Sequence, residues 1–129
     1  MYKVVVYGTL RSGESNHGLL EGSELLGTTT VNGYGMVSLG FFPAAFKMKG
    51  YSLVGEVYEV EDFVLEDLDV LEGYDRVSPE SGMYDRVLVD TEFGEAFMYV
   101  YNGDIEAYGD ELIHDWKEVA WLGRLLWKC

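Results

Sequence analysis

Hydrophobic and polar positions along the chain follow two different periods. Val4–Val6 is an uninterrupted apolar run, which predicts a strand buried on both faces. Further stretches rich in β-branched and aromatic residues predict more strands at residues 24–31, 34–39, 52–60, 84–91 and 95–101. Asn32-Gly33, between the first two of these stretches, is a hairpin signal. Pro43 ends any central strand, because it cannot donate to a ladder.

A helical period replaces this pattern at residues 62–72, where three leucines spaced three apart form one apolar stripe with Val64. Asp62 is the expected N-cap, and Gly73 the expected end of the helix. Residues 8–23 predict a glycine-rich loop with at most a short helix at 16–20.

A second apolar stripe predicts a final helix at residues 110–127. Its Trp121 and Trp127 cover either the core or a partner surface, and we favour the core. Because strands and helices do not alternate regularly, the pattern predicts an α+β fold with a small, mostly antiparallel curved sheet or β-barrel of about six strands flanked by helices. The 129 residues are expected to form one domain, residues 1–129.

Gly8 follows the first strand and allows either a turn with positive φ or a close approach of backbones. Backbone N–H groups in such a turn have no ladder partners and can form an anion-sized nest, to which Thr9 adds a hydroxyl. The alternative is an ordinary hairpin start. A P-loop is excluded, because Glu14 and Ser15 stand where the phosphate-binding Lys and Ser/Thr are needed.

Glu72 is the charged residue that fits its place least well. It shares the apolar stripe with Leu68, it lies in the last turn, where the helix dipole disfavours an anion, and Asp69 is a like charge three residues before it. Burial, dipole and neighbour all raise its pKa. The alternative is that Glu72 faces solvent or pairs with Arg76 or Arg86.

Charge and composition narrow the classes of partner. The chain carries 9 Lys+Arg against 23 Asp+Glu, a net charge of −14, which disfavours binding to nucleic acid and to anionic membranes. Cys129 is the only cysteine, and no signal leader or membrane-spanning run is seen, so we expect a cytoplasmic monomer. His17 is expected in a loop or cap and His114 in solvent, and no metal-ligand spacing occurs.

Four motifs resemble the γ-glutamylcyclotransferase-like family, with its γ-glutamylamine cyclotransferase branch nearest. They are Val6-Tyr7-Gly8-Thr9-Leu10-Arg11 followed by Ser15-Asn16-His17, then Gly55-Glu56-Val57-Tyr58-Glu59-Val60, Leu68-Asp69-Val70-Leu71-Glu72-Gly73 and Ser81-Gly82-Met83-Tyr84. The resemblance covers most of residues 3–101. It implies a small barrel with flanking helices, a loop at Tyr7–Leu10 that binds the glutamyl part of a substrate, and Tyr84 near that substrate.

The resemblance also implies a reaction, in which the α-amino group of a γ-glutamyl compound attacks its own γ-carbonyl. This lyase or acyltransferase chemistry releases 5-oxoproline and a free amine, with Glu72 as general base and no cofactor or metal. Residues 74–82 match neither the amine branch nor the glutathione branch fully, and the acidic charge favours a γ-glutamylamine. Two non-catalytic alternatives remain: a binder of a small carboxylate ligand or partner tail, and a protein–protein module at the C-terminus.

Overall fold

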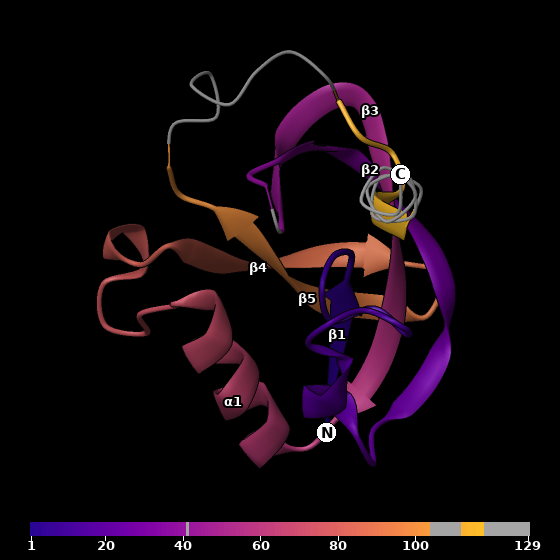
Figure 1. The fold of residues 1–129 in the computed structure, drawn as a ribbon, viewed down its shortest axis with the longest axis vertical. Helices are drawn as coiled ribbons and strands as arrows, with labels where there is room; N and C mark the ends of the chain where they lie inside the picture. Colours follow the sequence, from indigo (N-terminus) through magenta and orange to yellow (C-terminus); the bar gives the residue numbers. More distant parts are fainter. Residues whose placement is uncertain (41, 104–111, 118–129) are drawn as a thin grey trace, which may run out of the picture.

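The computed structural model describes residues 1–40, 42–103 and 112–117. Its five strands form one mixed, strongly curved sheet in the order β2-β3-β1-β5-β4 (Figure 1). The elements are β1 (Tyr2–Val6), η1 (His17–Leu20), β2 (Glu24–Ser38), β3 (Pro43–Val60), α1 (Asp62–Glu72), η2 (Pro79–Ser81), β4 (Tyr84–Thr91) and β5 (Gly94–Tyr101). The predicted α+β class with a curved sheet is confirmed. The described strands number five rather than about six, and their ladder does not close into a barrel.

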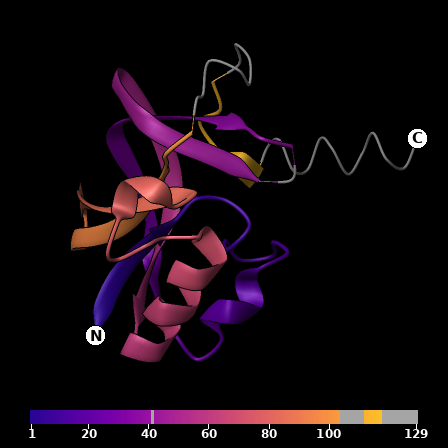
Figure 2. The same cartoon turned by 90° about the vertical axis from the view of Figure 1, so that its left-hand side faces the viewer.

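β1 occupies the centre of the sheet, antiparallel to β3 and parallel to β5. Its valines are buried on both faces, as the unbroken apolar run predicts. Val4 and Val6 pack in a core beneath α1 and η1, which lie together on one side of the sheet (Figure 2). Val5 packs in a second core on the other face, with Met36, Leu53 and Trp116. The end of β1, where the next loop begins, is therefore fixed by packing on both faces of the sheet.

The predicted hairpin at Asn32-Gly33 is wrong. β2 is continuous through this point, and Gly33, with φ of 82°, marks a register shift in the pairing with β3. A glycine with positive φ suits a bulge as well as a two-residue turn, so the dipeptide alone does not distinguish them. The change from β2 to β3 instead falls between Ser38, where β2 ends, and Pro43, where β3 begins. Pro43 begins β3, a position where its missing N–H costs no central ladder bond.

α1 has the predicted bounds, and Val64, Leu65 and Leu68 are buried on its inner face. Gly73 ends the helix in the left-handed region, with φ of 67°, as expected. Asp62 is not the N-cap: Glu61 holds that position, and it caps without a side-chain hydrogen bond. Leu71 does not extend the buried stripe, because it is 41% exposed.

The start of the predicted last helix is also wrong for the residues that the structure describes. Residues 112–115 are not helical, because they pair with the sheet: the Ile113 N–H donates to the Met36 carbonyl, and the Val54 N–H donates to the His114 carbonyl. The helix begins at Trp116. His114 is exposed, as predicted, whereas Trp121 and Trp127 lie outside the described residues. Within the described part, no helix has the length and apolar character needed to cross a bilayer.

Candidate functional site

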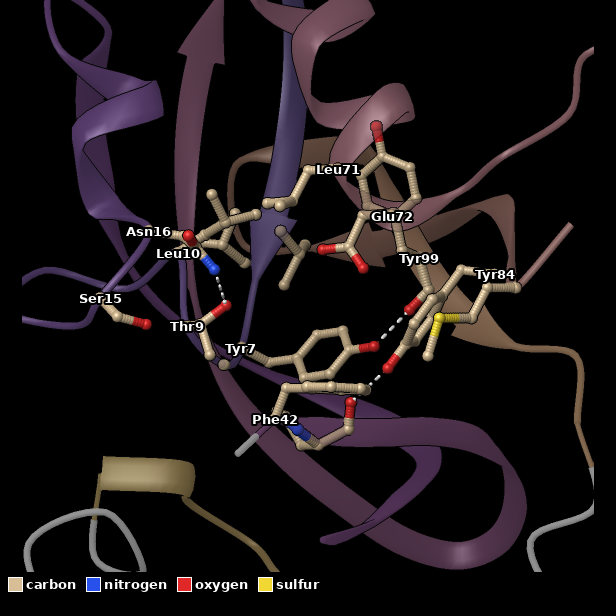
Figure 3. Close-up of a pocket in the computed structure, with 15 residues that line it drawn as sticks. Tyr7, Thr9, Leu10, Ser15, Asn16, Phe42, Leu71, Glu72, Tyr84 and Tyr99 are labelled. Carbon is tan, nitrogen blue, oxygen red and sulfur yellow. Dashed lines mark hydrogen bonds between the residues drawn. The ribbon is translucent and has the colours of Figure 1, made fainter. Parts of the chain in front are cut away.

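A cavity of about 250 Å³ opens between the loop after β1, the last turn of α1 and the strands β4 and β5 (Figure 3). All six residues that the sequence suggests for the site line it: Tyr7, Gly8, Thr9, Leu10, Glu72 and Tyr84. The fold thus brings together side chains that are more than sixty positions apart in the chain. Tyr99, Phe42 and Asn16 also line the cavity, although none of them was among the predicted site residues.

Glu72 is the last residue of α1, and its carboxylate points into the cavity (Figure 3). Burial raises its pKa from the usual 4.5 to about 7. Of the three causes expected from the sequence, burial is the one that accounts for this shift. Within the described part of the chain, the carboxylate makes no hydrogen bond or ion pair, so it is available to a ligand.

Arg76 and Arg86, the two alternative partners of Glu72, both bind Asp69 instead. The Arg86 Nη1 lies 2.8 Å from Asp69 Oδ2, and the Arg76 Nη2 lies 2.9 Å from the same oxygen. Two opposite charges thus offset Asp69, which explains why this neighbour does not add to the shift of Glu72.

Gly8 is required for close packing rather than for its dihedral angles, because its φ is not positive. A Cβ at this position would lie 2.6 Å from the Cγ and Cδ atoms of Pro43, where β3 begins. The Arg11 N–H donates to the Gly8 carbonyl at 3.0 Å and closes a turn. Among the described residues, no acceptor is found for the N–H groups of Gly8, Thr9 and Leu10. These N–H groups are the hydrogen-bond donors that the expected anion-binding nest requires.

Asn16 and His17, which follow this loop in the chain, hold it in place by hydrogen bonds. Asn16 donates from Nδ2 to Thr9 Oγ1 at 2.9 Å (Figure 3), and its backbone N–H donates to the Thr9 carbonyl. His17 Nδ1 lies 3.0 Å from the Leu10 carbonyl, and its ring contacts Tyr58. His17 therefore has a structural role in the loop, as the sequence suggested.

Three buried tyrosines, Tyr7, Tyr84 and Tyr99, line the cavity. The Tyr84 hydroxyl donates to the Pro43 carbonyl at 2.7 Å, and the Tyr7 hydroxyl donates to the Tyr99 carbonyl (Figure 3). Burial, and then the nearby Glu72 carboxylate, raise the pKa of Tyr7 and Tyr84 well above its ordinary value. Both phenols therefore stay neutral at physiological pH, and their protons are already engaged with backbone.

A second group of buried charges lies behind the loop, and sequence reasoning missed it. Arg11 and Glu56 are each 5% exposed and pair through the Arg11 Nε at 3.4 Å. Arg11 Nη1 also pairs with Asp115, and the Ser12 N–H donates to Glu56 Oε1 at 2.8 Å. The one available signal was Glu56 within the apolar stretch 53–60. No three acidic, histidine or cysteine side chains of the described residues form a metal-sized cluster.

Comparison with known proteins gives consistent matches. The family model described as γ-glutamyl cyclotransferase, AIG2-like, matches residues 4–118. The chain is 34% identical over 118 residues to the γ-glutamylcyclotransferase family protein YtfP of Escherichia coli K12, covering 90% of this chain and 96% of that protein. It is 31% identical over 122 residues to the γ-L-glutamyl-butirosin B γ-glutamyl cyclotransferase of Niallia circulans, covering 92% and 77% of the two chains. A crystal structure of an uncharacterized protein from Pyrococcus horikoshii superposes with a TM-score of 0.77 at 29% identity, over 96% of this chain and 97% of that one.

Proposed function

Because the chain belongs to the AIG2-like γ-glutamyl cyclotransferase family, we propose that it cyclises the glutamyl part of a γ-glutamyl compound to 5-oxoproline and releases the amine, with Glu72 as general base. One observation carries this proposal: across one cavity, the half-buried Glu72 carboxylate faces the loop after β1, and neither the carboxylate nor the N–H groups of Gly8, Thr9 and Leu10 have a hydrogen-bond partner among the described residues. A named γ-glutamyl cyclotransferase among the relatives supports the reaction type.

The loop at Tyr7–Leu10 is the anion-binding half of the proposed site. Its free N–H groups suit the substrate α-carboxylate or the oxyanion that develops on the γ-carbonyl, since fixed backbone donors need no reorganisation during the reaction. Folding the glutamyl chain so that its own nitrogen meets the γ-carbon makes the attack intramolecular, which removes much of the entropic barrier. The cavity volume of about 250 Å³ suits a group of this size.

Glu72 is the proton-transfer half of the site. An α-amino group has a pKa of ~8 and is mostly protonated at neutral pH, so it cannot attack until it loses a proton. A carboxylate with a pKa of about 7 is matched to accept that proton. The new C–N bond forms as the γ-carbonyl opens, and the C–N bond to the leaving nitrogen then breaks. Two protons pass from the attacking to the leaving nitrogen, so the amine departs as ammonium and no water is consumed.

The neutral tyrosines complete this site without competing for the proton. Tyr7 and Tyr84 have pKa values raised by burial, and both hydroxyl protons bind backbone carbonyls. They therefore exclude water and shape the wall, while Glu72 is the group in this wall that titrates near neutrality. We assign Tyr84 a substrate-contact role through its ring rather than its proton.

Release of 5-oxoproline from a γ-glutamyl substrate, measured with Glu72→Gln beside the unchanged protein, tests the proposal. The amide is nearly isosteric but cannot accept the proton, so kcat should fall roughly 10²–10⁴-fold. Calorimetry with 5-oxoproline should show retained binding. Glu66→Gln is the matched control, because Glu66 lies on the exposed face of the same helix.

Three outcomes separate the alternatives. Near-normal turnover by Glu72→Gln would remove Glu72 from the role of base. Binding of 5-oxoproline without turnover of any γ-glutamyl compound would favour a non-catalytic binder of small carboxylates. Absence of both would remove this cavity from the function.

A further inference from the structure

Asp69 is a buried carboxylate whose hydrogen bonds all come from charged or phenolic side chains outside α1. It is 5% exposed. Arg86 Nη1 donates to both of its oxygens, at 3.0 and 2.8 Å, and the Tyr99 hydroxyl donates to Oδ1 at 2.7 Å. Arg76 adds two bonds to Oδ2. Asp69 lies one turn before Glu72 and thus binds three side chains from outside its helix. A carboxylate that is merely buried on a helix face needs fewer hydrogen-bond partners than this.

These bonds connect the two halves of the site. Tyr99 stands on β5 and lines the cavity; its hydroxyl reaches Asp69, and its carbonyl accepts the Tyr7 hydroxyl. Arg86 stands on β4, with its guanidinium 4.8 Å from the ring centroid of Tyr74 and 4.5 Å from that of Phe97. Two hydrogen bonds therefore connect Tyr7, at the start of the loop after β1, through Tyr99 on β5 to Asp69 in the last turn of α1.

We propose, on the basis of the function proposed above, that Asp69 is the positioning residue of the site. Its bonds to Arg86 and Tyr99 hold the last turn of α1 so that Glu72 faces the loop, and the arginine charge cancels its own. Glu72 then ionises one turn after an Asp69 whose charge is offset by Arg86. Asp69 does not touch the cavity, so it acts through Glu72 and Tyr99.

The charges around Glu72 make this role measurable. The phenols that face it, Tyr7, Tyr84 and Tyr99, are neutral because burial raises the pKa of each. The buried charge on the same helix is Asp69, which two arginines bind. Arg86 has a side chain only 14% exposed, whereas Arg76 is 54% exposed and is screened by solvent. Removing the charge of Asp69 leaves the buried Arg86 unpaired, whereas removing the charge of Arg86 leaves Asp69 with the exposed Arg76 as its remaining cation, so the two changes act on Glu72 with opposite sign.

The titration of the Glu72 carboxyl carbon, followed by NMR and assigned with Glu72→Gln, tests the proposal without requiring turnover. Asp69→Asn leaves Arg86 unpaired and should lower the Glu72 midpoint by roughly 1 pH unit. Arg86→Met keeps the apolar stem but leaves Asp69 under-compensated, and should raise the midpoint by a similar amount, about 1 pH unit. Asp67→Asn removes a charge from the exposed face of the same helix and is the control, with no shift expected.

Kinetics give the second readout. Asp69→Asn should lower kcat roughly tenfold and move the acid limb of the pH–rate profile in the direction of the NMR shift, because the base is both displaced and less basic. Midpoint shifts of opposite sign in the two variants support the proposal even if the unchanged protein turns over no γ-glutamyl substrate. Absence of turnover would overturn only the proposed function. Unchanged midpoints in both variants overturn the proposal. If Asp69→Asn does not fold, Arg86→Met carries the test, with Arg76→Met as the partner that should leave the midpoint in place.

Discussion

A carboxylate at the C-terminal end of a helix ordinarily faces water, because the unpaired carbonyl groups there disfavour a second negative charge. Glu72 holds this position but faces a cavity, and no residue of the described chain neutralises it. The result is a carboxyl group whose pKa is about 7. Such a group changes charge within the range where enzymes work, which gives two measurable consequences.

The first consequence is the pH dependence of kcat/KM. If Glu72 accepts a proton from the substrate ammonium, the productive form has the carboxylate ionised and the amine protonated. The profile should therefore be bell-shaped, with an acid limb near the Glu72 pKa of about 7. The alkaline limb should lie near ~8, the pKa of an α-amino group. Rates measured from pH 5 to pH 10 check this, and an acid limb near 4.5 would mean that Glu72 is not desolvated.

The second consequence is a change of stability with pH. The folded-state pKa of Glu72 is raised, so its contribution is fully present below the unfolded value of 4.5 and is lost as the pH rises through about 7. Glu72→Gln should gain stability over the unchanged protein as the pH rises. Between pH 5 and pH 8.5 the difference in unfolding free energy should grow by about 2 kcal/mol. Urea denaturation at the two pH values measures it, and a constant difference would contradict the burial of Glu72.

The close contact between Gly8 and Pro43 gives a prediction that depends on steric fit alone. In Gly8→Ala the new methyl group would lie 2.6 Å from two ring atoms of Pro43, so the loop must shift from β3. Binding of 5-oxoproline should weaken more than about tenfold, because the displaced N–H groups no longer point at the same position of the ligand. Gly18→Ala is the control, since nothing lies within 4 Å of its Cβ. Thr9→Ala should weaken binding only modestly; a larger effect of Thr9→Ala than of Gly8→Ala would assign recognition to the hydroxyl.

At the scale of elements, the loop after β1 depends on a segment far away in the chain. Arg11 binds both Glu56 of β3 and Asp115, so residues 112–117 support the loop from behind. Trp116, next to Asp115, is buried in the core on the far face of β1. The loop proposed to bind the anion is thereby tied to β3 and to residues 112–117, whereas the helix end that carries the proposed base is tied to β4 and β5.

Asp115→Asn tests this support. The variant leaves Arg11 with only its long contact to Glu56, so the loop should become less ordered while Glu72 is unaffected. We expect KM to rise several-fold, by roughly 3–10-fold, with kcat nearly unchanged, the signature of lost ground-state binding. Asp90→Asn, which removes an exposed acid from β4, is the control. A fall in kcat with constant KM would instead connect this pair to the proton-transfer half.

The accuracy of the sequence predictions follows the range of the interactions involved. The bounds of α1 and the two strands after it were predictable, because their periods and end signals are local. The hairpin at Asn32-Gly33 was not, since a bulge has the same local signal. Asp69 and Glu56 read as ordinary polar positions, because their arginine partners lie 17 and 45 residues away.

At the scale of the whole molecule, one curved sheet carries a core on each face, and the cavity lies where β1 emerges between them. The net charge of −14 gives the molecule as a whole a negative field. Arg76 and Arg86 do not counter this field locally, because Asp69 binds both. The loop after α1 carries Asp75, whose pKa is lowered chiefly by N–H groups of Ser78 and Val77, so it stays ionised. This distribution bears on the choice of leaving group.

A leaving group with additional negative charge should be disfavoured. The cysteinylglycine part of glutathione carries an uncompensated carboxylate that the field repels, whereas the carboxylate of the lysine part of γ-glutamyl-lysine is balanced by an ammonium group. The apolar side chains at the cavity, Phe42, Leu71 and Met83, suit the aliphatic stem of such an amine. We therefore expect kcat/KM for γ-glutamyl-lysine to exceed that for glutathione by about tenfold at low salt, and this ratio to shrink as salt screens the field over the Debye length of ~10 Å at 0.1 M. A panel of γ-glutamyl-lysine, γ-glutamyl-alanine and glutathione, scored for 5-oxoproline at 0.02 and 0.5 M NaCl, measures both. Preference for glutathione, or a ratio that does not respond to salt, would show that contacts within the cavity rather than the charge of the molecule select the amine.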